Sequence, residues 1–161
     1  MKKAIFVSII AIMLVAALAG FAPAKQDDFV IGIMTGTVSQ GEEEFRAAQN
    51  AAAKYPGKII TATYPDNFSS EVETTVARTL ELASNGADLI VFVQSVPGTA
   101  AAIDKVHEIY PDFPFITGVP AEAPEVISPK AGVILSADEI AMGTTIIEQA
   151  AKMGAKTFVH Y

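Results

Sequence analysis

Small polar side chains gather in two short stretches of this sequence. Thr35 to Gln40, read as TGTVSQ, follows the apolar run 29–34, and Gln94-Ser95 follows the apolar run 88–93. Their hydroxyl and amide groups can both donate and accept hydrogen bonds, as the binding of a neutral polar molecule requires. Neither stretch contains lysine or arginine, so a strongly anionic ligand would find no compensating charge there.

Two further loops follow predicted strands in the same way. Tyr64 to Phe68 comes after the run 58–63, and Gly118-Val119-Pro120 comes after the run 114–117. Tyr64 and Phe68 could stack on the ring of a sugar or nucleoside, or they could pack beneath the loop as core residues. Across the four loops we expect ligand contacts from Thr35, Gly36, Thr37, Ser39, Gln40, Tyr64, Asp66, Gln94, Ser95 and Gly118.

Phosphate binding by the first loop is the main alternative. Glycines at positions 32, 36 and 41 fit neither the dinucleotide-binding pattern nor the P-loop pattern. The triplet Thr35-Gly36-Thr37 is similar to the phosphate loop of flavodoxins, so a flavodoxin-like nucleotide- or flavin-binding module is the alternative function. Glutamates at positions 42–44 stand where such a phosphate would approach, which disfavours this alternative.

Residues for other chemistry are few. The sequence contains no G-x-S-x-G motif and no cysteine, which excludes disulfides, thiolate metal sites and a cysteine nucleophile. His107 and His160 have no metal-ligand spacing and no neighbouring nucleophile. Glu42, Glu43 and Glu44 would point in different directions on a helix, which favours a helix-terminus role over acid–base catalysis. We therefore expect no catalytic residue, no cofactor and no metal.

The elements that position the loops alternate along the chain. Strands are predicted at 29–34, 58–63, 88–93, 114–117 and 132–135, and another is expected at 157–161. The continuous apolar residues of the runs at 29–34 and 88–93 are typical of strands buried on both faces. Helices are predicted to begin at the S-x-x-E capping boxes of Ser39, Ser70 and Ser136 and after Gly98. The alternation predicts an α/β fold, a three-layer doubly wound parallel sheet with strand order 2-1-3-4-5. Its switch point would bring the four loops together at the carboxyl ends of the strands.

Helical spacing of apolar residues predicts which faces are buried. We expect the second helix to bury Val72, Val76, Leu80 and Ala83, and the third to bury Ile103, Val106 and Ile109. The prolines within 119–131 predict an irregular connection. In the last helix, Ile140, Ile147 and Ala151 should either fold back on the sheet or remain exposed.

The N-terminus has the pattern of an export signal. Lysines at positions 2 and 3 precede the apolar run 4–21, and Ala22-Pro23-Ala24 fits a cleavage site, so residues 1–24 are predicted to be a signal peptide. A permanent membrane anchor is the alternative. Without those two lysines the chain has nine basic and eighteen acidic residues, a net charge of −9. This charge disfavours nucleic acid and anionic lipid as partners. We expect a protein of the periplasm or cell exterior that meets the membrane only through an uncleaved N-terminal segment.

Four segments together resemble a known family. FVIGIMTGT, GADLIVFVQSVPGTAAAIDKV, PFITGVP and GVILSADEIAMGTTIIEQAAKMGAKTFVHY are similar to the first half of a type I periplasmic-binding-protein fold. The last segment is the most specific, because Ser136-Ala137-Asp138 and Met142-Gly143 match the run in which a strand ends at a hinge and a glycine-containing helix follows. The resemblance is to bacterial solute-binding proteins related to basic membrane lipoproteins and sugar-binding proteins.

This resemblance implies a ligand-binding role without chemistry. It implies an extracytoplasmic solute-binding protein that captures a small neutral polar ligand, such as a sugar or nucleoside, for an ABC-type uptake or sensing system. A membrane transporter or receptor would be its partner. Residues 25–136 would form the first ligand-binding lobe, and 137–161 would cross a hinge at Ser136 and Asp138 into a second lobe of which the chain holds only the start. Phe21 stands where many relatives carry a lipid-attachment cysteine.

Overall fold

The computed structural model describes residues 29–159, so the predicted signal peptide at 1–24 lies outside the described residues. Strands and helices alternate, as the sequence predicts. In chain order they are β1 (Ile31–Thr35), α2 (Val38–Lys54), β2 (Ile59–Thr63), α3 (Val72–Ser84), β3 (Leu89–Phe92), α4 (Thr99–His107), β4 (Phe115–Gly118), α5 (Pro124–Ile127), β5 (Val133–Leu135) and α6 (Glu139–Lys152).

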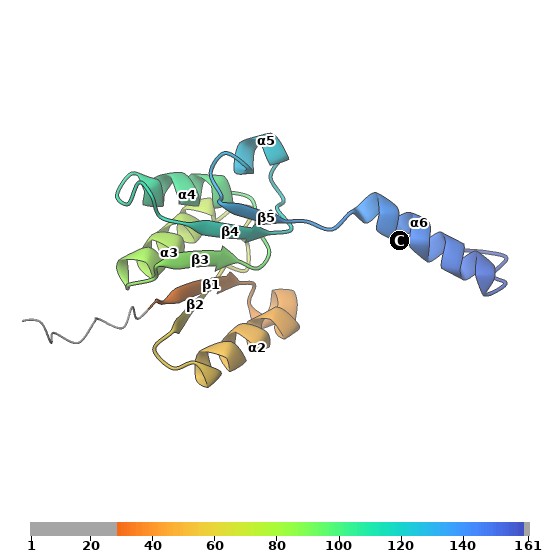
Figure 1. Ribbon diagram of the computed structural model, residues 1–161, viewed down its shortest axis with the longest axis horizontal. Coiled ribbons are helices and arrows are strands. Elements are labelled where there is room, and N and C mark those ends of the chain that lie inside the picture. The colour runs from red at the N-terminus through yellow and green to blue at the C-terminus, as the bar shows by residue number, and fades with distance from the viewer. Residues whose placement is uncertain (1–28, 160–161) are drawn as a thin grey trace, which may run out of the picture.

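The strands form one parallel sheet in the order β2-β1-β3-β4-β5, which confirms the predicted topology. Helices α3 and α4 cover one face of this sheet and α2 covers the other, while α5 lies beside α4 (Figure 1). The predicted three-layer α/β fold is therefore confirmed. Because all strands run the same way, the loops after β1, β2, β3 and β4 emerge at one edge of the sheet, here called the carboxyl edge.

Aromatic rings form the centre of the core between the sheet and α3 and α4. The ring of Phe92 stacks on that of Tyr64 at a centroid distance of 6.5 Å and on that of Phe115 at 5.9 Å. Ile103 and Val106 of α4 are fully buried against this layer, as the sequence predicts. Tyr64 could have stacked on a ligand or packed in the core, and the structure shows that it packs in the core.

The predicted capping boxes are displaced from the observed helix starts. Thr37 precedes α2 and forms its box with Gln40, and a kink at Gly41 (φ −164°, ψ 83°) divides that helix. Glu71, and not Ser70, precedes α3. Asp138 caps α6 by accepting a hydrogen bond from the backbone N–H of Ala141 at 2.9 Å. Asp and Thr side chains close to the turn cap as well as serine does, so the S-x-x-E pattern alone did not locate the ends.

Two buried faces also differ from the prediction. In α3 the buried residues are Thr75, Thr79, Leu82 and Ala83, whereas the predicted valines are only half-buried. Thr79 can be buried because its hydroxyl donates a hydrogen bond to the Thr75 carbonyl one turn earlier, at 2.8 Å. Ile109 lies beyond the end of α4 and is exposed.

Helix α6 projects away from the sheet (Figure 1). None of its residues is buried, and Ile140 and Ile147 are 86% and 54% exposed, so the exposed version of the prediction is confirmed. The predicted strand at 157–161 is not formed by residues 157–159, and the last two residues lie outside the described range. Residues 119–131 contain the short helix α5 within an otherwise irregular connection.

Candidate functional site

Hydroxyl groups from the β1–α2 loop meet a carboxylate from the β2–α3 loop at the carboxyl edge. Both the Thr37 and the Ser39 hydroxyls donate to the same oxygen of Asp66, and the second of these bonds measures 2.9 Å. The two hydroxyls also contact each other at 2.8 Å. Ser39 and Asp66 are exposed, so this cluster faces solvent with one Asp66 oxygen left over for a further donor.

Gln40 joins the same two loops through its amide group. Its Nε2 donates to the backbone carbonyls of Pro65 and Asp66 at 3.0 and 2.9 Å. Its Oε1 accepts the backbone N–H of Thr37 at 3.0 Å, which completes the capping box. The amide is thus held by three bonds, and the predicted site residues Thr37, Ser39, Gln40 and Asp66 form one connected surface, here called the polar cluster.

Hydrogen bonds from Thr37 and then Ser39 hold the pKa of the Asp66 carboxyl below its ordinary value of 3.8. A folded-state pKa that lies below the unfolded value stabilises the fold above the unfolded pKa, and this stabilisation is lost as the pH falls through the folded pKa. The polar cluster is therefore ionised and intact at neutral pH.

Asp66→Ala is expected to lower the urea midpoint of unfolding at pH 7. The difference from the unchanged protein should shrink as the pH falls from the ordinary carboxyl pKa through the lower folded-state pKa of Asp66, because the carboxyl group is then protonated in the folded protein as well. Urea titrations between pH 7 and pH 3 measure this. Asp112→Ala is the matched control, because Asp112 is exposed and has no hydrogen bond or ion pair among residues 29–159. A difference that stays constant across this pH range would contradict the assignment.

Other predicted site residues lie in the interior. Thr35, Tyr64 and Ser95 are each 1% exposed, and Gly36 and Gly118 are also buried. Burial raises the pKa of the Tyr64 phenol well above its ordinary value, while the Thr99 hydroxyl acts in the opposite direction. Gln94 is exposed beside them. The carboxyl edge therefore offers the polar cluster and Gln94 at the surface.

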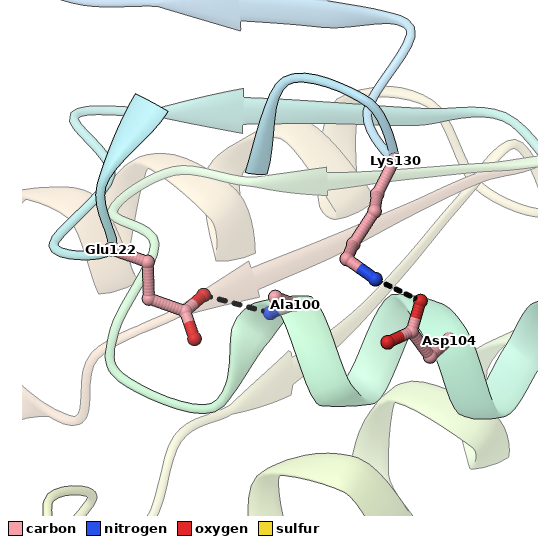
Figure 2. A network of polar contacts seen from close by, with 4 residues as sticks. All are labelled: Ala100, Asp104, Glu122 and Lys130. Carbon is pink, nitrogen blue, oxygen red and sulfur yellow. Dashed lines mark hydrogen bonds and ion pairs between the residues drawn. The ribbon is translucent and has the colours of Figure 1, made fainter. Parts of the chain in front are cut away.

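A strap formed by residues 119–131 covers the start of α4, a feature that the sequence did not reveal. The Glu122 carboxylate accepts the backbone N–H groups of Gly98 at 3.2 Å and Ala100 at 2.8 Å. Lys130 forms an ion pair with Asp104 on the same helix, and Figure 2 shows both anchor points. No local pattern marks Glu122, because its partners lie more than twenty residues away in the sequence.

The strap fills the position at which α4 would bind an anion. A helix N-terminus favours negative charge, and here the protein supplies its own carboxylate. Residues 29–159 contain no group of three or more histidine or acidic side chains suited to a metal ion. Within the same residues, no helix has both the length and the apolar character to cross a bilayer. The site thus combines hydroxyls, an amide and a carboxylate with no exposed cation in the polar cluster.

The family model described as "Protein of unknown function (DUF3798)" matches residues 29–161. The chain belongs to this family. It is also 36% identical over 144 residues to a protein of Treponema pallidum (strain Nichols) described as "Uncharacterized protein". That match covers 83% of this chain and 64% of the relative, so the chain spans less than two thirds of the relative's length. A second protein of that organism with the same description is 34% identical over 71 residues, which cover 44% of this chain and 33% of that protein.

Part of a crystal structure from Clostridium difficile 630, described as that of a "Putative transcriptional regulator", has the same α/β fold as this DUF3798 protein. The two superpose with a TM-score of 0.67 and 24% sequence identity. The match covers 84% of this chain and 41% of that one. At this identity the likeness shows the fold alone.

Proposed function

We propose that this DUF3798 chain forms the first lobe of an extracytoplasmic solute-binding protein, and that it binds a small neutral polar ligand without transforming it. The observation that carries the proposal is the polar cluster at the carboxyl edge of β1 and β2. A parallel sheet of this kind binds ligands at that edge, beside the switch point between its first and third strands. Hydroxyl, amide and carboxylate groups are what the hydroxyls of a sugar or nucleoside need.

The charges of the carboxyl edge support a neutral rather than an anionic ligand. Asp66 is ionised at neutral pH, and Glu122 already occupies the N-terminus of α4. Arg46 lies midway along α2, and it is paired with Glu42 at 2.7 Å. A nucleotide or flavin phosphate would therefore approach carboxylates and meet no free cation in the polar cluster, which disfavours the flavodoxin-like alternative.

The exposed helix α6 supports a two-lobed protein. Its apolar side chains, including Ile140 and Ile147, have no partner element in the part of the chain that the structure describes. We propose that α6 follows a hinge at Ser136 and Asp138, and that a second lobe in the longer protein covers it and supplies further ligand contacts. Closure of two lobes about a hinge would then trap the ligand. Export by the predicted signal peptide and delivery to a membrane transporter or receptor belong to the same proposal.

A ligand screen on a full-length relative tests this function. Thermal unfolding of the longer Treponema pallidum protein should be measured with sugars, nucleosides and amino acids, one at a time. A true ligand at about a hundredfold its Kd stabilises the fold by about 2.7 kcal/mol, enough to raise the unfolding temperature by several degrees. A uniformly flat screen would count against solute binding. A yellow colour that copurifies with the protein would favour the flavodoxin-like alternative instead.

A further inference from the structure

A second candidate site lies on the free edge of the sheet, away from the carboxyl edge. The strand order leaves β2 paired only with β1, so one side of β2 has no neighbouring strand. A cavity of about 380 Å³ lies against this side, between α2 and α3. The polar residues that line it are Gln49, Thr61, Thr63, Arg78, Glu81 and Asn85. A volume of this size falls in the range of small-molecule sites.

The back wall of the cavity is the unpaired backbone of β2. The Lys58 carbonyl and the Tyr64 N–H bond to β1, at 2.9 and 2.8 Å. Successive residues of a strand face opposite edges, so the N–H and C=O groups of Ile59, Thr61 and Thr63 face outward. The Thr61 N–H and C=O have no hydrogen-bond partner among residues 29–159. They offer one donor and one acceptor to an added strand.

Arg78 stands at the carboxyl end of this backbone, and Glu81 follows it one turn further along α3. The half-buried Arg78 donates through one guanidinium nitrogen to the carbonyl and the hydroxyl of Thr63, at 2.9 and 3.0 Å. Its other N–H groups remain for a carboxylate, because a guanidinium has five donors. Glu81 takes part in none of the ion pairs formed within residues 29–159. Helix α3 runs antiparallel to β2, so Glu81 and Asn85 lie toward the start of the strand.

We propose that this free edge, here called the β2-edge site, binds a short peptide with free termini as an added parallel strand. The peptide carboxylate lies on Arg78 and its central amide pairs with Thr61. Its ammonium group lies at Glu81 and Asn85. Arg78 and Asn85 are about 10 Å apart along the helix axis, which matches an extended tripeptide of about 10 Å.

Binding of trialanine to the full chain, followed by isothermal titration calorimetry, tests the proposal without any substitution. Trialanine with free termini is expected to bind. Acetylation of its N-terminus or amidation of its C-terminus should each weaken binding about tenfold, since each removes one charge-assisted contact. No heat of binding at millimolar trialanine would overturn the proposal. So would equal affinities for the free and the amidated peptide.

Substitutions at Thr61 test the added strand itself. Thr61→Pro removes the outward N–H without removing a bond to β1, and edge strands tolerate proline. It should weaken trialanine binding at least tenfold, whereas Thr61→Val keeps the N–H and should change binding less than threefold. Circular dichroism checks that both variants remain folded. If the two variants bind alike, or if Arg78→Gln binds as well as the unchanged protein, the β2-edge site is refuted. Neither result would bear on the function proposed for the polar cluster.

Discussion

Phe92→Ala is expected to lower the free energy of unfolding by about 3–5 kcal/mol, the cost of deleting a buried aromatic ring and leaving a cavity. Phe92 is fully buried at the centre of the sheet. Its ring contacts Tyr64 on one side and Phe115 on the other, both stacked within 16° of parallel. Its removal therefore breaks both contacts of the aromatic layer, and the rigid strands around it cannot close the gap.

Thermal unfolding of the Phe92→Ala protein measures this effect. A fall in the unfolding temperature of roughly 10–20 °C corresponds to that loss for a domain of this size. Phe158→Ala is the matched control, because Phe158 lies beyond α6 and is 48% exposed. Its substitution should change the unfolding temperature little. If both variants unfold at the same temperature, the aromatic layer is not the centre of stability.

The sheet could be predicted from the sequence because its central strands are continuous apolar runs, although the edge strand β2 is only half-buried and β5 is largely exposed. Runs such as 89–93 are apolar throughout, which distinguishes them from the helices with their one-sided stripes. The order of the strands then follows from right-handed crossovers. The ends of the helices were harder to predict, because several polar residues near each end are able to cap it. Thr37 and Asp138 are the caps because they immediately precede the first helical residue, whereas Ser39 lies inside α2 and Ser136 lies two residues before Asp138.

The site could be predicted only as a set of loops. The sequence indicated that residues after β1 and β2 would meet, and the Asp66 contacts with Thr37 and Ser39 agree with that expectation. It could not separate the exposed Ser39 from the buried Ser95, because burial of a loop hydroxyl depends on what the rest of the chain places over it. For the same reason it did not reveal Glu122, whose role depends on a long-range contact with α4.

Gly118→Ala is expected to destabilise the protein by about 1–3 kcal/mol, the cost of forcing an extra methyl group into a filled space. Gly118 ends β4 at the carboxyl edge, and its carbonyl accepts the Ser95 N–H at 2.8 Å. A Cβ added there would lie 2.3 Å from the Val93 carbonyl oxygen and 3.3 Å from that of Phe92. Both obstacles are backbone atoms, so the ends of β3 and β4 would have to move apart.

Gly143→Ala is the matched control for this substitution. A Cβ at Gly143 meets nothing within 4 Å, and its position inside α6 favours alanine by up to about 1 kcal/mol. Urea unfolding should therefore show a lower midpoint for Gly118→Ala, and circular dichroism should show equal or greater helix content for Gly143→Ala. An unchanged midpoint for Gly118→Ala would mean that β3 and β4 separate at no cost. The loops that hold Ser95 and Glu122 would then be more loosely joined to the sheet than the hydrogen bonds at the carboxyl edge indicate.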